Sequence, residues 1–310
     1  MSEPVSSRPM RSDTNRLPTV HVATVHWRDD RFVDVQLRFL QRYVEPPLRV
    51  YAFLNHLPEG HEGKFFYASS APLKSHALKL NLLADMICFA ADSDDDWLVF
   101  LDGDAFPVAP VRPALTHPLS VHGLVAVHRE EKGAYQPSPC FCVTTVGLWR
   151  RLGGDWQRIG RPTNENRAQR SPSADVGGRV LRALNREGIE WHPLLRTNTW
   201  NPHRLFHGVY GDLVYHHGAG FRPRIDRADR ARLRGLRGRF SARLADRLPK
   251  SGLGRALRRR LHPVQRLKRE ILVEQDRLDD GLYDRIAADD QSLFAELASG
   301  CRPGRRAGPR

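Results

Sequence analysis

The sequence predicts an α/β fold, because apolar strands and helices alternate along its first hundred residues. Residues 18–26 (PTVHVATVH), 48–54 (LRVYAFL) and 97–101 (WLVFL) are short and rich in β-branched or aromatic side chains, as buried strands are. Residues 31–43 have apolar side chains at helical spacing, and residues 75–91 form a long, mostly apolar helical segment. The order β-α-β-α-β favours a parallel sheet with helices on its faces.

Beyond residue 101 the pattern is looser but still mixed. We expect strands at 123–127, 141–146, 189–194 and 209–215, a helix over 175–186, and a polar loop over 155–173. From Arg230 onward the pattern is helical, interrupted at Pro249 and Pro263. The predicted organisation is a disordered N-terminus (1–17), an α/β domain (18–223) and a helical, Arg-rich C-terminal extension (224–310).

Composition excludes several classes of protein. Hydrophobic residues make up 40% of the 310 residues, which is enough for a core and argues against wholesale disorder. No run of 18 apolar residues predicts a membrane span, and the first residues lack the apolar stretch of a secretory signal. Four cysteines are too few for a disulfide scaffold. We therefore expect a cytoplasmic protein with reduced thiols.

The net charge of +14 is concentrated in one segment. Residues 222–270 carry 18 Lys and Arg against four Asp and Glu, so the rest of the chain is neutral. A solvated pair of basic helices is the simplest interpretation, and an anionic membrane surface is the partner we expect if the segment binds one. The segment argues against nucleic acid as a partner, because Phe240 is the only aromatic residue available there to stack on bases.

The strongest local signal is an acidic pair after the third strand. Asp102 and Asp104 follow WLVFL with only Gly103 between them. Ligands of parallel α/β sheets bind at the carboxyl ends of the strands, and paired carboxylates suit Mg²⁺ or Mn²⁺. An ordinary Asp-Gly-Asp turn is the alternative. The nearby acidic run 92–96 (DSDDD) lacks the glycine and glutamate of a calcium loop, so we expect a solvated loop there.

With this pair in place, residues 18–223 resemble nucleotide-sugar-dependent glycosyltransferases of the GT-A fold. The apolar strand followed by Asp102-Gly103-Asp104 is similar to the DXD motif of that superfamily. The resemblance implies a GT-A-like α/β domain with a mixed sheet flanked by helices. It also implies a divalent cation, Mn²⁺ or Mg²⁺, held by Asp102 and Asp104 against the diphosphate of a nucleotide-sugar donor, with Gly103 beside the donor.

Two later segments extend the resemblance. Asp175 precedes a helix that ends at Gly188, which is similar to the segment whose acidic residue deprotonates the acceptor in inverting members, although Ala174 stands where a second acid is usual. An N-cap role for Asp175 is the structural alternative. Tyr215-His216-His217-Gly-Ala-Gly-Phe-Arg222 resembles the segment in which a His joins the metal ligands and a basic residue meets phosphate. Neighbouring side chains on a strand face opposite ways, so we expect only one of the two histidines to bind metal.

The resemblance further implies a nucleotide site along the strand ends. The residues expected there are Thr24, Val25, His26, Asn55, His76 and Lys79.

The expected function is metal-dependent transfer of a sugar from a nucleotide sugar to a hydroxyl acceptor on a glycan, lipid or small molecule, by inversion or retention. Two alternatives stay open. A haloacid-dehalogenase-type phosphohydrolase also ends an apolar strand in Asp-x-Asp, but that motif usually opens its domain. A non-catalytic α/β protein would bind anionic lipid or nucleic acid through residues 230–269. The protein is expected in the cytoplasm, where residues 230–269 would place it peripherally on the membrane.

Overall fold

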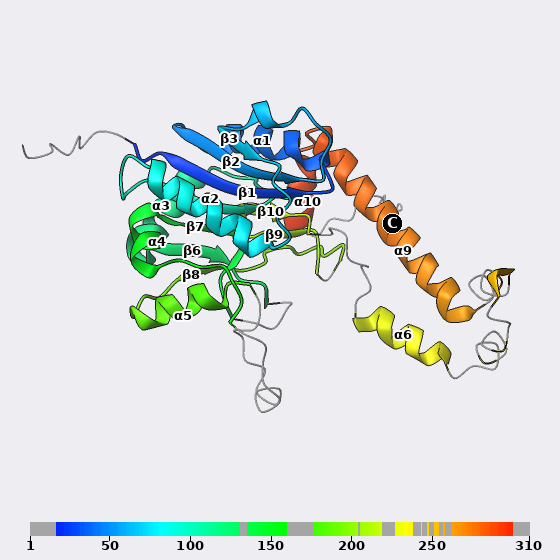
Figure 1. Cartoon of the computed structure of the whole chain (residues 1–310). Helices are drawn as coiled ribbons and strands as arrows, with labels where there is room; N and C mark the ends of the chain where they lie inside the picture. The colour runs from blue at the N-terminus through cyan, green and yellow to red at the C-terminus, as the bar shows by residue number, and fades with distance from the viewer. Residues whose placement is uncertain are drawn as a thin grey trace, which may run out of the picture.

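The computed structural model describes residues 17–130, 135–159, 176–203, 205–218, 227–237 and 262–299, together with 243, 247, 251–253 and 257. Its main body is a mixed seven-stranded sheet between two layers of helices (Figure 1). This confirms the expected α/β architecture. The N-terminal segment 1–16 lies outside the described residues.

The main sheet has the strand order β3-β2-β1-β4-β7-β6-β8. Strands β1, β2, β3 and β4 are parallel, as the β-α-β-α-β pattern predicts, and β7 alone runs antiparallel to its two neighbours. The carboxyl ends of β1 and β4 therefore lie side by side at one edge. The strands are β1 (Val20–Trp27), β2 (Leu48–Asn55), β3 (Tyr67–Ser69), β4 (Trp97–Asp102), β6 (Leu124–Val127), β7 (Ser138–Thr145) and β8 (His192–Leu194).

Helices cover both faces because successive strand residues point to opposite sides. Val99 and Leu101 of β4 face the core shared with helices α1 (Arg31–Tyr43) and α3 (Val111–His122). Leu98 and Phe100 face the opposite core. That core is shared with helices α2 (His76–Ala90), α4 (Val146–Leu152) and α5 (Gly178–Arg186). A short turn of 3-10 helix, η1 (Glu62–Lys64), precedes β3.

A second, antiparallel sheet adjoins the acidic pair. It has the order β5-β10-β9, formed by β5 (Ala105–Pro107), β9 (Gly208–Tyr210) and β10 (Val214–His216). The single strand expected over 209–215 is wrong: the chain reverses there, with φ of +58° at Gly211 and +52° at Asp212. Apolar residues alternate in both strands of this short hairpin, so the sequence pattern resembles one continuous strand. The Gly-Asp pair forms the turn between them.

The C-terminal helices are α6 (Arg227–Arg237), α9 (Pro263–Ala287) and α10 (Ser292–Ser299). Helix α9 extends away from the body (Figure 1), and α6 contacts α9 through a hydrogen bond from Gln275 to Asp229 at 3.3 Å. The C-terminal end of α9 and the helix α10 pack on the body. Leu282, Ile286 and Leu293 share a buried cluster there with Phe39 and Phe106. A boundary at residue 223 stays an expectation, but the last helices complete the core. None of the described helices is long and apolar enough to cross a membrane.

Two helices were not expected from the sequence. Helix α3 contains Pro113 and Pro118, which lower helix propensity, yet Val111, Leu115 and Leu119 recur on one buried face. Helix α4 directly follows β7, where Thr145 caps it by accepting a hydrogen bond from the Leu148 amide.

The expectation of a solvated loop over 92–96 is wrong for its last residue. Asp96 is fully buried and accepts a hydrogen bond from the Thr19 amide at 2.8 Å. Its other oxygen lies 3.5 Å from Nε2 of the buried His21. The buried carboxylate therefore joins the starts of β1 and β4, because buried charges need such partners.

Candidate functional site

The acidic pair lies where the central strand β4 leaves the main sheet. Asp102 is the last residue of β4, and a tight turn over Gly103 and Asp104 leads into β5 of the second sheet. The side chains of Asp102 and Asp104 are 27% and 26% exposed, so both reach solvent while anchored in a buried turn. This is the carboxyl-end position at which parallel α/β sheets bind ligands.

Pairing of the second sheet brings a histidine to the acidic pair. In the register of β10 against β5, His216 is opposite Ala105, so it lies beside Asp104. His216 Nε2 is 3.5 Å from Asp102 Oδ2 and 3.4 Å from Asp104 Oδ1. One ligand atom from each of the three residues lies within 4.8 Å of the others. Residues 114 positions apart in the chain thus form one compact set, fixed further by the Gly218 amide, which donates to Asp104 Oδ2 at 2.9 Å.

The negative charge of the two carboxylates favours a cation, and a bound cation would displace the proton that they hold on His216. Burial alone would lower the pKa of His216, but Cys140 and Asp104 beside it raise that pKa to about 10. Burial raises the pKa of Asp104, but the neighbouring His216 outweighs this effect and holds it below the ordinary value. Two carboxylates and one imidazole are a donor set that suits Mn²⁺, and the carboxylates also suit Mg²⁺. The residues present therefore fit the expected divalent cation.

Gln36 supports the turn, and sequence reasoning missed it. This residue of α1 is fully buried and donates Nε2 hydrogen bonds to the carbonyl oxygens of Asp102, at 2.8 Å, and Ala105, at 2.7 Å. Its Oε1 lies 3.1 Å from His26 Nε2. A polar residue on the apolar face of the helix over 31–43 was the available signal, because buried amides are retained where they have partners.

Gly103 packs against the end of β1. A Cβ at this position would lie 2.7 Å from the Val25 carbonyl oxygen and 2.8 Å from His26 Nδ1. Only glycine fits here without displacement of the backbone. The close approach of β1 and β4 therefore depends on the residue between the two acids.

Two residues of α2 point to this edge of the sheet. Ser75 caps the helix, and His76 in its first turn places Nε2 3.2 Å from Asp102 Oδ1. Lys79, one turn on, is 2% exposed, and its Nζ lies 5.5 Å from the centre of the Trp27 ring. Burial lowers the pKa of this amine. His76 thus joins the acidic pair directly, and Lys79 lies beside the end of β1.

The remaining strand-end residues are buried. Thr24, Val25 and His26 are 0%, 6% and 2% exposed, and burial lowers the pKa of His26 to about 4 despite its bond to Gln36. Asn55, at the end of β2, is 2% exposed and donates to the Ala71 carbonyl oxygen at 2.6 Å. These side chains face the interior, so contact between them and a nucleotide stays a prediction.

His217 does not join the acidic pair. Its Nε2 lies 2.7 Å from Asp279 of α9, on the other side of the strand from His216. Asp175 and Arg222 lie outside the described residues, so the structure does not position the expected base or the expected phosphate contact.

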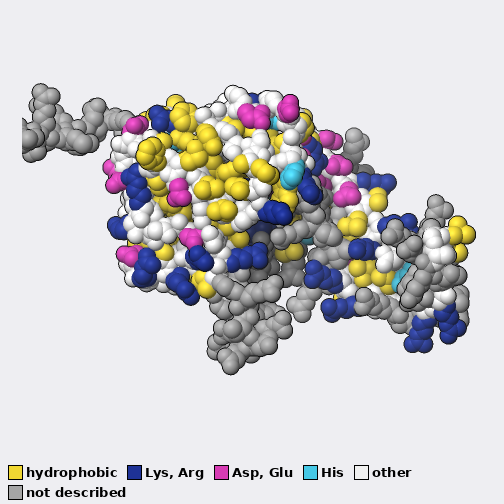
Figure 2. Space-filling view, viewed as in Figure 1, with side chains coloured by type: hydrophobic (Ala, Val, Ile, Leu, Met, Phe, Trp, Pro, Cys, Tyr) yellow, Lys and Arg dark blue, Asp and Glu magenta, His cyan; other side chains and the backbone are white. Residues whose placement is uncertain are grey.

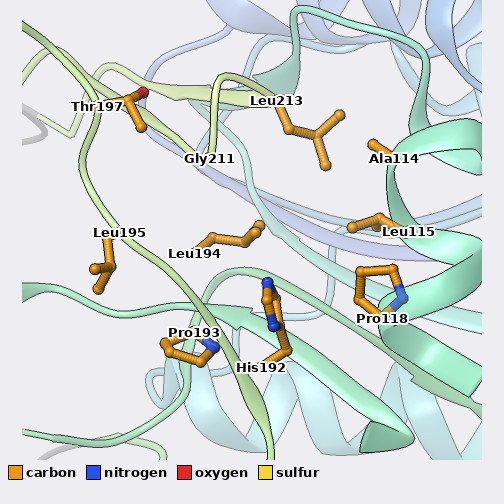
Figure 3. Close-up of a pocket in the computed structure, with 10 residues that line it drawn as sticks. All are labelled: Ala114, Leu115, Pro118, His192, Pro193, Leu194, Leu195, Thr197, Gly211 and Leu213. Atoms are coloured by element: carbon orange, nitrogen blue, oxygen red, sulfur yellow. The ribbon is translucent and has the colours of Figure 1, made fainter. Parts of the chain in front are cut away.

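A separate apolar pocket of about 300 Å³ lies between α3, β8 and the turn of the second sheet (Figure 3). Leu115 and Pro118 line one side of it, and Leu194, Leu195 and Leu213 the other. None of the residues expected at the functional site is among its lining residues, so it does not bear on the chemistry of the acidic pair.

No family model matches the chain, and a search of curated proteins finds no match. Solved structures give weak matches. The mannosyltransferase PcManGT from Pyrobaculum calidifontis, in complex with GDP-Man and Mn²⁺, is 13% identical with a TM-score of 0.40, over 95% of this chain and 88% of that chain. The galactosyltransferase LgtC, in complex with donor and acceptor sugar analogs, is 12% identical with a TM-score of 0.32, over 53% of this chain and 70% of that chain.

Apo GlyE, a glycosyltransferase of Streptococcus pneumoniae TIGR4, is 11% identical with a TM-score of 0.35, over 57% of this chain. The match spans only 45% of GlyE, less than half of its length. These identities and scores are too low to assign a role to this chain. A mixed sheet between two helical layers, a small second sheet beside it and an acidic pair at the end of the central strand give this chain a GT-A-like α/β fold.

Proposed function

We propose that this protein is a metal-dependent glycosyltransferase that moves a sugar from a nucleotide sugar to a hydroxyl acceptor on a glycan, lipid or small molecule. The observation that carries the proposal is the set Asp102, Asp104 and His216 at the carboxyl end of β4. Carboxylates alone are common at turns, but two carboxylates and an imidazole from distant segments, held in a buried turn, are the donors of a divalent-cation site.

Each residue has a role in this proposal. Asp102, Asp104 and His216 hold Mn²⁺ or Mg²⁺; the bound ion would neutralise the diphosphate as it leaves. Gln36 holds the turn that carries the two carboxylates. His76, 3.2 Å from Asp102, is suited to orient that carboxylate or to meet the donor phosphate. The proposed donor site also includes Gly103, Lys79 and Arg222. It is completed by the residues at the ends of β1 and β2, which are Thr24, Val25, His26 and Asn55.

Asp175 is the proposed general base if transfer inverts the anomeric centre, because an acceptor hydroxyl must lose its proton as it attacks. Retention would not require it. Activity of Asp175→Asn with product anomers resolved by NMR distinguishes the two: an inverting product from wild type together with an inactive variant supports this role.

The test is thermal stabilisation by a panel of nucleoside diphosphates and nucleotide sugars, with and without Mn²⁺. Wild type should be stabilised by one nucleotide only when Mn²⁺ is present, and Asp104→Asn should lose the effect. Asp95→Asn, in the exposed part of the acidic loop, is the matched control and should respond as wild type does. No stabilisation of folded wild type by any donor, together with Asp102-dependent hydrolysis of p-nitrophenyl phosphate, would favour the phosphohydrolase instead.

Residues 230–269, called the C-terminal arm, are proposed to dock on an anionic membrane surface from the cytoplasm. Lys and Arg side chains gather on this arm (Figure 2), and Arg230, Arg232 and Arg234 of α6 are exposed. Each base near an anionic bilayer contributes about 1 kcal/mol. The full chain should sediment with phosphatidylserine vesicles at low salt, and Arg230→Glu/Arg234→Glu should weaken this. Arg151→Glu/Arg182→Glu, an equal charge change on the body, should not; equal loss in both would refute a role for the arm.

A further inference from the structure

A second cluster of metal-binding residue types lies between the second sheet and α9. His207 precedes β9, His217 follows β10, and Asp279 belongs to α9. All three are buried, with side chains 1%, 2% and 3% exposed. One ligand atom from each lies within 4.8 Å of the others. The cluster is distinct from the acidic pair, because His216 and His217 project from opposite sides of the chain.

The backbone holds the two histidines together. The His207 amide donates to the His217 carbonyl oxygen at 3.0 Å, and the ring centres are 4.7 Å apart. His217 Nε2 lies 2.7 Å from Asp279 Oδ1, and His207 Nε2 lies 3.9 Å from the same oxygen. Both imidazoles therefore converge on one carboxylate oxygen in a site closed to solvent.

Neighbouring groups orient the cluster. The Tyr215 hydroxyl lies 2.9 Å from His217 Nδ1, so that ring presents Nε2 to Asp279. Metal-binding histidines typically use the second nitrogen in this way, and the contact fixes which nitrogen is free to ligate. Arg31 lies 3.8 Å from Asp279 Oδ2. One oxygen of the Asp279 carboxylate therefore faces the two histidines, and the other faces the Arg31 guanidinium.

We propose that His207, His217 and Asp279 bind a zinc ion that fastens α9 to the body, with a buried water molecule as its fourth ligand. Two imidazoles and a carboxylate are ligands that zinc favours, whereas the harder acidic pair favours Mn²⁺ or Mg²⁺. Tetrahedral bonds of about 2.0–2.1 Å require His217 Nε2 and Asp279 Oδ1 to separate to about 3.3 Å, a small adjustment of two side chains. Asp279 shares a helix face with Leu282 and Ile286, so the ion would extend the buried contact of α9 by one turn.

The ligand set predicts a stoichiometry that chemical analysis can measure. The test is made in the full chain carrying Asp104→Asn, which removes the first site. After zinc loading and gel filtration, this protein should retain about one zinc ion per chain. Adding His207→Gln or Asp279→Asn should abolish retention, with the fold checked by circular dichroism. Adding His21→Gln is the matched control, because it disrupts another buried His–Asp pair and should leave the zinc in place.

Cobalt gives a second readout. This readout does not require a variant that lacks one of the three ligands to fold. Co²⁺ bound to the Asp104→Asn chain should show the intense visible bands of a tetrahedral site. Tyr215→Phe, which keeps the ring and loses the hydroxyl, should weaken Co²⁺ and Zn²⁺ binding about 10–100-fold.

Folded Asp104→Asn protein that retains no zinc and gives no tetrahedral cobalt spectrum would overturn the proposal and leave a metal-free hydrogen-bonded cluster. Retention in the Asp279→Asn variant would overturn it too. Failure of the glycosyltransferase proposal would leave these results unchanged, because the first site is removed throughout.

Discussion

The side-chain amide of Gln36 donates a hydrogen bond to the backbone carbonyl of Asp102, 2.8 Å away and 66 residues along the chain. A second bond from the same nitrogen reaches Ala105. The turn between the two carboxylates is therefore held by a helix that carries none of the proposed metal ligands, and the geometry of the acidic pair depends on α1.

Gln36→Leu should damage both stability and metal binding. The substitution removes three polar contacts and leaves two carbonyl oxygens without this donor, which should cost about 3 kcal/mol in the free energy of unfolding. Mn²⁺ affinity should fall because the carboxylates lose their fixed positions. Urea unfolding and isothermal titration measure the two effects. Gln265→Leu, exposed on α9, is the control and should change neither.

Gly103→Ala should disturb the same turn by overpacking. The added methyl would lie under 3.0 Å from the Val25 carbonyl oxygen and from Nδ1 of the His26 ring, and overpacking of this kind costs about 1–3 kcal/mol. Gly63→Ala is the matched control, because nothing lies within 4 Å of a Cβ there. Thermal unfolding with and without Mn²⁺ compares the two variants. Wild-type stability and Mn²⁺ response in Gly103→Ala would contradict the close approach of β1 and β4.

Much of this fold could be predicted from local patterns. Apolar runs such as WLVFL mark buried strands because a strand covered on both faces has no polar side. Helix α3 was not predicted because its prolines indicate a low helix propensity. Burial of its apolar face against the core outweighs that low propensity. The hairpin of β9 and β10 escaped because the turn occupies so few residues that the two strands look continuous.

The site was predictable in residue type but not in arrangement. Asp102 and Asp104 are found from their place after a strand, because the sheet dictates where strand ends meet. The choice of His216 over His217 as the neighbour of the acids depends on the register of β10 against β5, which no single segment contains. Gln36 and Asp96 were missed because buried polar residues cannot be told from surface ones until their partners are known.

His216→Gln should weaken Mn²⁺ binding more than any change at a neighbour of the set. Loss of a direct ligand should reduce affinity by at least the roughly 10–100-fold that loss of an outer-shell partner causes. His76→Gln, whose ring touches only Asp102 of the set, should have a smaller effect. Isothermal titration with Mn²⁺ ranks the two. A larger loss in His76→Gln would place the cation between α2 and Asp102 instead.

His26 should make stability fall in acid. Its folded pKa is about 4 against an ordinary value of 6.5, because burial disfavours the charged ring. Between these values the unfolded chain binds a proton that the folded chain does not, so stability is full above pH 6.5 and declines as pH falls toward 4.

The loss attributable to His26 is about 3 kcal/mol across this window. Urea unfolding at pH 5 and pH 7 should show a smaller difference in His26→Gln than in wild type. Burial also lowers the pKa of His21, which therefore adds a decline of the same sign in both proteins. Equal pH dependence in the two proteins would show that the pKa of His26 is not lowered in the folded state.

Ile286→Ala tests whether the end of α9 belongs to the core. Ile286 is fully buried in the cluster that joins α1, the second sheet and α10, and truncation of such a side chain costs about 2–5 kcal/mol. Val273→Ala on the same helix is the control, because Val273 is 49% exposed and its truncation should be nearly neutral. Urea unfolding of the full chain gives both values. If the body unfolds in one transition that Ile286→Ala lowers, the last helices and the α/β sheet are one cooperative unit; an unchanged main transition would mean that α9 and α10 detach before the sheet unfolds.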